Sequence, residues 1–178
     1  MKLTPFEDTN LIFIDTEFTS LDPYEGELLS IGIVKLNGDK LYIELECDAT
    51  PTEWVQKNIV PMLDGPKFSR KDTIRQIKEF LGTTNPYAVA FVDNYDTIYL
   101  TKLFGVDKLP FRWMTIDFTS VLFGMGVNPV KFIGDQSGAR AFYKKLGIKK
   151  SAYRQHHALD DAQLLRDVWV KMTQDDSM

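Results

Sequence analysis

The sequence predicts an α/β protein whose mixed central sheet is flanked by helices, and three observations support this. Leu11 to Ile14 are consecutive apolar residues, mostly β-branched or aromatic, as in a strand covered on both faces. Asn37-Gly38 lies between two further apolar runs, and this dipeptide is typical of a tight hairpin. The apolar run at residues 87–92 leads directly into a helical pattern, as strands do in α/β folds. We expect three antiparallel strands, then parallel ones, in a single domain over residues 1–178.

The amino-terminal half contains the hairpin and two helices. Strands are expected from Leu11 and over residues 28–36 and 40–47, and helices over residues 51–60 and 69–81. Pro61 follows the first helix and Gly82 follows the second, as residues that end helices commonly do. We interpret the basic residues of the second helix region as a solvated face; they are Lys67, Arg70, Lys71, Arg75 and Lys78.

The carboxyl-terminal half alternates short strands with helices. Strands are expected over residues 87–92 and 110–116, and helices over residues 93–100, 117–124, 136–146 and 155–169. Asp93 is expected at an N-cap, where its carboxylate can accept a backbone N–H. The last helix has a buried stripe at helical spacing, formed by Ala158, Ala162, Leu165, Trp169 and Met172.

Composition narrows the class of protein. A chain of 178 residues with 44% hydrophobic and 26% charged residues can bury a core. The single cysteine, Cys47, excludes an internal disulfide and a multi-cysteine zinc site, and it fits a reducing cytoplasm. No apolar run reaches membrane-spanning length, so we expect a cytoplasmic protein without a membrane partner. The net charge of −4 argues against a non-specific nucleic-acid coat, but not against an enzyme that holds phosphodiesters through metal ions.

Two acids at the end of the first strand are the first candidates for chemistry. Asp15 and Glu17 stand at positions i and i+2, so their carboxylates project from the same face of the strand. Two neighbouring anions resist burial unless a cation lies between them, and oxygen ligands suit magnesium or manganese. The alternative is an ordinary strand that runs into a polar loop.

Further candidates lie on two helices. Asp96 shares a helix face with apolar residues three, four and seven positions later. Asp161 lies at the edge of the buried stripe of the last helix, whereas Asp160 faces the opposite side. His156 and His157 precede this helix, and a neutral histidine can accept a proton from water. The basic run at residues 144–154 is either a solvated loop or a contact for phosphates.

Three segments resemble the motifs of the DEDDh 3′-to-5′ exonucleases of the ribonuclease H-like superfamily. They are residues 15–19, 94–100 and 156–161, and the resemblance extends from Leu11 to about Trp169. The family's five-residue step from histidine to aspartate selects His156 over His157. Phe18 and Ser20 replace the commoner Thr and Gly, which makes this variant more similar to small bacterial and phage exoribonucleases than to proofreading subunits. The compressed second motif leaves Asp93 as a rival ligand.

The resemblance implies a mechanism and a substrate. The four carboxylates of Asp15, Glu17, Asp96 and Asp161 would hold two Mg²⁺ or Mn²⁺ ions, and His156 would act as the base. The substrate would be the 3′ end of single-stranded RNA or DNA, with RNA favoured, and the product a nucleoside 5′-monophosphate. Phe18, Thr19 and Leu21 are candidates to pack against the terminal base.

Three alternatives and one open question remain. The alternatives are a hydrolase of small nucleotides or dinucleotides, a non-catalytic nucleic-acid-binding domain on the same fold, and an acidic calcium loop. The last lacks the regular spacing of such loops. Many relatives are dimers, so a homodimer is also open.

Overall fold

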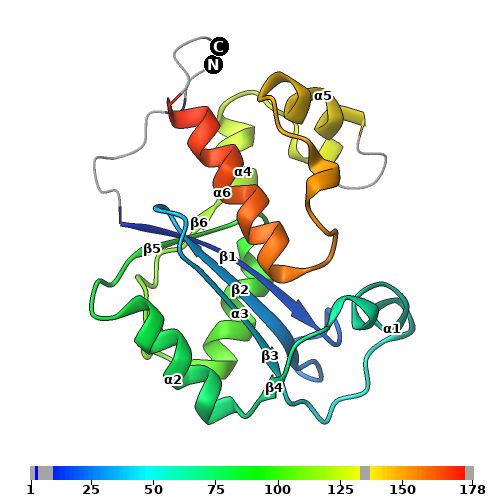
Figure 1. Cartoon of the computed structure of the whole chain (residues 1–178), viewed down its shortest axis with the longest axis vertical. Coiled ribbons are helices and arrows are strands. Elements are labelled where there is room, and N and C mark those ends of the chain that lie inside the picture. The colour runs from blue at the N-terminus through cyan, green and yellow to red at the C-terminus, as the bar shows by residue number, and fades with distance from the viewer. Residues whose placement is uncertain (1–2, 4–9, 133–136, 175–178) are drawn as a thin grey trace.

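The computed structural model describes residues 3, 10–132 and 137–174 of the chain. A six-stranded sheet in the order β4-β3-β2-β1-β5-β6 runs through the middle of the molecule (Figure 1). The strands are β1 Leu11–Phe18, β2 Leu28–Lys35, β3 Lys40–Leu45, β4 Lys67–Phe68, β5 Tyr87–Ala90 and β6 Ile116–Asp117. β1, β2 and β3 are antiparallel neighbours, and β4, β5 and β6 each pair in parallel. The predicted mixed sheet is therefore confirmed.

Helices cover both faces of this sheet. The α-helices are α1 Glu53–Asn58, α2 Arg70–Leu81, α3 Asp93–Phe104, α4 Phe118–Gly124, α5 Ser137–Lys145 and α6 Ala158–Gln174. Short 3₁₀ turns are η1 Val60–Met62, η2 Pro129–Phe132 and η3 Lys150–Ala152. The helices α2 and α3 pack on one face, and α4, α5 and α6 on the other (Figure 1). No helix in the described part of the chain is both long enough and apolar enough to cross a membrane.

The alternation of side chains along β1 builds both cores. Phe13 lies on the α6 face, where its ring meets Trp169 edge-on at a centroid distance of 5.9 Å. Ile12 and Ile14 lie on the opposite face, in the core with α2 and α3. Because Asp15 and Glu17 follow Phe13 at steps of two, they are placed on the α6 face.

Four details differ from the sequence-based expectations. The strand predicted over residues 110–116 is wrong except at its end, because Pro110 lacks an N–H and only Ile116–Asp117 pair with β5. The two-residue strand β4, which contains Lys67, was not expected. Arg70 is not simply solvated: its guanidinium donates to the carbonyls of Leu103 and Lys102 at the end of α3.

The N-cap assignment of Asp93 is also wrong. Val92 is the N-cap of α3 and makes no side-chain cap, while Asp93 is the first helical residue. The carboxylate of Asp93 accepts a hydrogen bond from the hydroxyl of Thr115 instead. Residue 136, the expected start of the fifth helix, lies outside the described residues.

Candidate active site

A glycine in β2 lets the last helix approach the sheet next to Asp15. Gly32 is the β2 partner of Asp15 in the β1–β2 ladder. A Cβ at Gly32 would lie 2.3 Å from the carbonyl oxygen of Ala158, the first residue of α6. Only glycine permits this backbone contact, which brings the first turn of α6, and with it Asp161, over Asp15.

The loop before α6 directs a backbone donor at Asp161. His156 has φ of +59°, in the left-handed region that non-glycine residues rarely adopt. Its backbone N–H donates to Oδ2 of Asp161 at 2.9 Å. A strained residue of this kind costs about 1–3 kcal/mol and is typical of functional sites. The turn therefore fixes the carboxylate of Asp161 relative to the ring of His156.

The carboxylate of Asp96, on α3, lies close enough to Asp15 to raise the pKa of that residue. Oδ1 of Asp96 accepts a hydrogen bond of 2.6 Å from the hydroxyl of Thr16 on β1, and Asp96 is 6% exposed. Burial, opposed by this hydrogen bond, raises the pKa of Asp96 to about 7. Asp96 therefore faces inward, as its helix position predicted. Neither Asp96 nor Asp93, which is bound to Thr115, is one of the three carboxylates that cluster most closely.

Three carboxylates converge at the centre of the site. Ligand oxygens of Asp15, Glu17 and Asp161 all lie within 4.8 Å of one another. Burial and the charges of its acidic neighbours, Asp96 first among them, raise the pKa of Asp15 well above its usual value. Burial and the nearby aspartates raise the pKa of Glu17 to about 8, and burial raises that of Asp161 to about 6. A hard divalent cation would relieve this repulsion, and an all-carboxylate donor set fits magnesium or manganese.

His156 lies beside the acid cluster at one end of a cavity. Burial lowers its pKa, and the positive charge of Lys150 lowers it further. The ring nitrogen Nε2 lies 3.2 Å from the amide nitrogen of Gln155, and Trp54 meets the ring edge-on at 5.1 Å. His157 differs in that it is buried, stacked on Tyr42, and placed with Nδ1 next to the N–H of Asp160. The two neighbouring histidines thus have separate positions, and only His156 lines the cavity described next.

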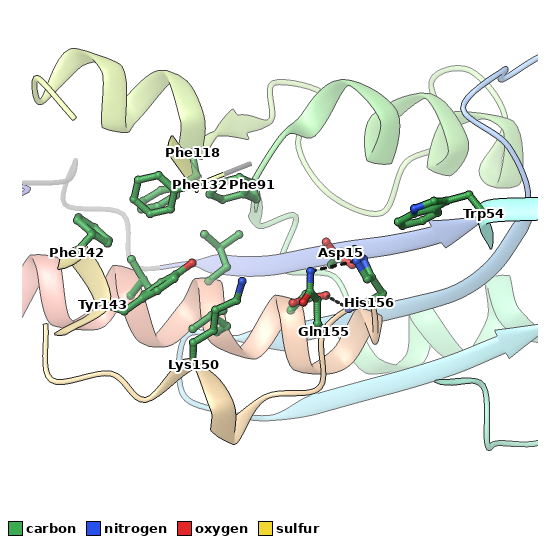
Figure 2. A pocket seen from close by; sticks show the side chains of 14 residues that line it. Asp15, Trp54, Phe91, Phe118, Phe132, Phe142, Tyr143, Lys150, Gln155 and His156 are labelled. Atoms are coloured by element: carbon green, nitrogen blue, oxygen red, sulfur yellow. Dashed lines mark hydrogen bonds between the residues drawn. The ribbon is translucent and has the colours of Figure 1, made fainter. Parts of the chain in front are cut away.

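A cavity of about 680 Å³ opens onto the acids and extends away from them between α4, α5 and α6 (Figure 2). Asp15, His156 and Asp161 line one end together with Trp54, which is 54% exposed. The other end has aromatic and aliphatic walls formed by Phe91, Phe118, Phe132, Phe142, Tyr143, Leu164, Leu165 and Val168. This volume lies within the range of small-molecule pockets.

The residues predicted to contact a base occupy different environments. Phe18 stacks in parallel on Tyr99 at 4.4 Å and is partly buried. Thr19 is 1% exposed, and its hydroxyl accepts from the N–H of Glu27, so in this structure it braces the loop. Leu21 is 64% exposed on that loop. Their assignment to the substrate stays a prediction.

Sequence reasoning missed three residues that shape the site. Gly32 could have been noticed, because an isolated glycine in a strand often marks a close backbone approach. Trp54 and Gln155 carried no comparable signal. Trp54 lies on a short helix far along the chain from both motifs that it adjoins. Gln155 lines the cavity, and its side chain lies next to the ring of His156.

The fold and the acid cluster together define a DEDD-type nuclease of the ribonuclease H-like class. The family model RNase_T, described as Exonuclease, matches residues 12–168, and the chain belongs to this family. The family depends on divalent metal ions, and the acid cluster is present here. The sequence-based recognition is therefore confirmed at this level.

Two curated proteins and one solved structure are similar to this chain at low sequence identity. The chain is 24% identical over 177 residues to DNA polymerase III PolC-type of Thermotoga petrophila and to that of Thermotoga maritima. The match covers 95% of this chain but only 12% of either polymerase. A solved structure, yeast NOT1 MIF4G domain co-crystallized with CAF1, superposes with a TM-score of 0.55 at 12% identity. The superposition covers 90% of this chain and 77% of the matched chain, and it supports the fold alone.

Proposed function

We propose that the chain is a metal-dependent exonuclease that removes nucleotides from the 3′ end of single-stranded RNA and releases nucleoside 5′-monophosphates. The observation that carries this proposal is the convergence of three carboxylates from β1 and α6 beside one half-buried histidine, with the buried carboxylate of Asp96 on α3 close enough to raise the pKa of Asp15. Asp15 and Glu17 come from β1, Asp96 from α3 and Asp161 from α6. We infer RNA rather than DNA from the first motif, which is similar to that of small exoribonucleases.

The acids and the histidine have distinct roles in this proposal. Asp15, Glu17, Asp96 and Asp161 would hold two Mg²⁺ or Mn²⁺ ions, which would lower the pKa of a bound water and stabilise charge on the phosphate. His156 would accept the proton of the attacking water, since burial lowers its pKa and so favours the neutral ring. Leu21 and the exposed edge of Phe18 would pack against the terminal base, on a loop braced by Thr19. Assembly of the chain as a homodimer is part of the same proposal.

The test uses single strands of RNA and DNA of equal length, labelled at the 5′ end. With Mg²⁺ or Mn²⁺, the protein should shorten the RNA stepwise and leave a ladder of labelled products, because nucleotides leave from the 3′ end. Asp15→Ala and an excess of chelator should both abolish the ladder. Liquid chromatography should identify nucleoside 5′-monophosphates as the product.

Other outcomes would replace the proposal. A ladder with DNA alone would reverse the choice of sugar. Immediate release of the labelled nucleotide would mean degradation from the 5′ end. If folded, metal-bound protein left both strands intact, turnover of dinucleotides would indicate a small-nucleotide hydrolase, and its absence a binding domain.

A further inference from the structure

One cation lines the cavity that contains the acids. Lys150 is the first residue of η3 and forms part of the wall between the acidic and aromatic ends. Its side chain is partly buried, and Figure 2 shows its amine directed into the cavity between Tyr143 and Gln155. Among the described residues that line this cavity, no other lysine and no arginine is present.

Lys150 shares this cavity with the centre of the site. Asp15, His156 and Asp161 line it together with Lys150. The ammonium group therefore faces the same space as the proposed base and two proposed metal ligands.

The neighbouring basic residues do not line this cavity. Arg154 is not among its lining residues. Lys149 is exposed and lines a different hollow of about 420 Å³. Within the basic run, Lys150 is thus the residue whose charge is directed at the cavity.

Charge balance indicates what this cation does. Two divalent ions would neutralise the four carboxylates, so the phosphates of an incoming strand would bring uncompensated negative charge into a partly buried cavity. A charged group that loses water without a partner is costly, and an ammonium group is a common partner for phosphate. Lys150 supplies one positive charge beside the reacting centre.

We propose that Lys150 is a substrate-binding residue that binds a phosphate of the single strand and positions the strand over the acid cluster. This inference rests on the proposed function, since it assumes a nucleic-acid substrate at the same site. The other explanation is that Lys150 only offsets the charge of Asp161. The two explanations differ in their effect on strand affinity and on its dependence on salt.

The test measures binding of a fluorescent ten-nucleotide RNA in Mg²⁺ as a function of KCl concentration. The parent is His156→Ala, which should keep its metal ligands and turn over slowly. Adding Lys150→Met should weaken binding on the order of tenfold and reduce the slope of log Kd against log salt by about 0.7, the value for one phosphate contact to a single strand. Lys149→Met, the matched control, should change neither quantity, and Lys150→Arg should restore both.

In the enzyme with His156 intact, Lys150→Met should raise KM more than it lowers kcat. Lys150→Gln is a second neutral variant, and both should match the parent in thermal melting with Mg²⁺. If Lys150→Met and Lys150→Gln bind RNA with the parent's affinity and salt slope, the inference is overturned while the proposed function stands. If the parent itself does not bind RNA, the proposed function fails and this inference fails with it.

Discussion

Glu17→Gln should stabilise the metal-free protein although it removes a proposed ligand. The pKa of Glu17 is raised to about 8 in the folded protein, against 4.5 in the unfolded chain. An acid whose pKa is higher in the folded protein binds its proton more tightly there. The folded state is therefore favoured at low pH, and its stability falls as the pH rises from 4.5 to about 8. At pH 7 the lost stability amounts to about 3 kcal/mol at most. The neutral amide avoids this cost.

Glu44→Gln is the matched control, because Glu44 is also a buried glutamate on the same sheet. It is 2% exposed, and its Oε1 accepts from the N–H groups of Asp64 and Gly65 and from the hydroxyl of Tyr42. No hydrogen bond to the carboxylate of Glu17 is found among the described residues. Glu44→Gln should therefore destabilise by about 1–3 kcal/mol, since it weakens charge-assisted hydrogen bonds.

The assay is thermal unfolding with a chelator at pH 7 and at pH 5. Glu17→Gln should raise Tm by up to about 6–12 °C at pH 7 and much less at pH 5. Added Mg²⁺ should raise Tm of the natural protein more than that of the variant, because binding to the folded state stabilises it. A variant that melts at or below the natural protein at pH 7 without metal would refute the argument that the acid cluster is electrostatically strained.

Two further predictions concern geometry and roles. Gly32→Ala places a methyl group against the backbone of α6, so it should weaken Mg²⁺ affinity at least tenfold by calorimetry; unchanged affinity would mean that Asp161 is not positioned by this contact. His156→Ala should lower kcat on the order of 10²–10⁴-fold while Mg²⁺ affinity stays within about twofold, since a general base contributes to turnover and not to ligation. Asp15→Ala should lose both turnover and Mg²⁺ affinity. If His156→Ala retained its kcat, the proton transfer would belong to another group.

The sequence was sufficient for the topology of the sheet centre and for the direction of the acids. The apolar run of β1, the Asn37-Gly38 turn and the period-two spacing of Asp15 and Glu17 depend on neighbours in the chain, so local rules reach them. The inward position of Asp96 follows from helical periodicity in the same way. Short-range signals failed where pairing partners are distant, as at the two-residue strands β4 and β6.

Other features were decided by tertiary structure, because they join segments far apart in the chain. The carboxylates of Asp15 and Asp161 lie close together because Gly32 lets α6 approach β2. The need for glycine at this position is apparent only once α6 packs against β2. The carboxylate of Asp93 binds the hydroxyl of Thr115, which lies on a loop before β6. The position of this loop depends on contacts with distant segments, so the sequence near Asp93 could not predict the bond. The cavity beside Lys150 forms between packed helices. The sequence shows that Lys150 belongs to a basic run, but not that its side chain lines a cavity. Local chemistry thus determined which residues could react, and long-range packing determined which of them meet.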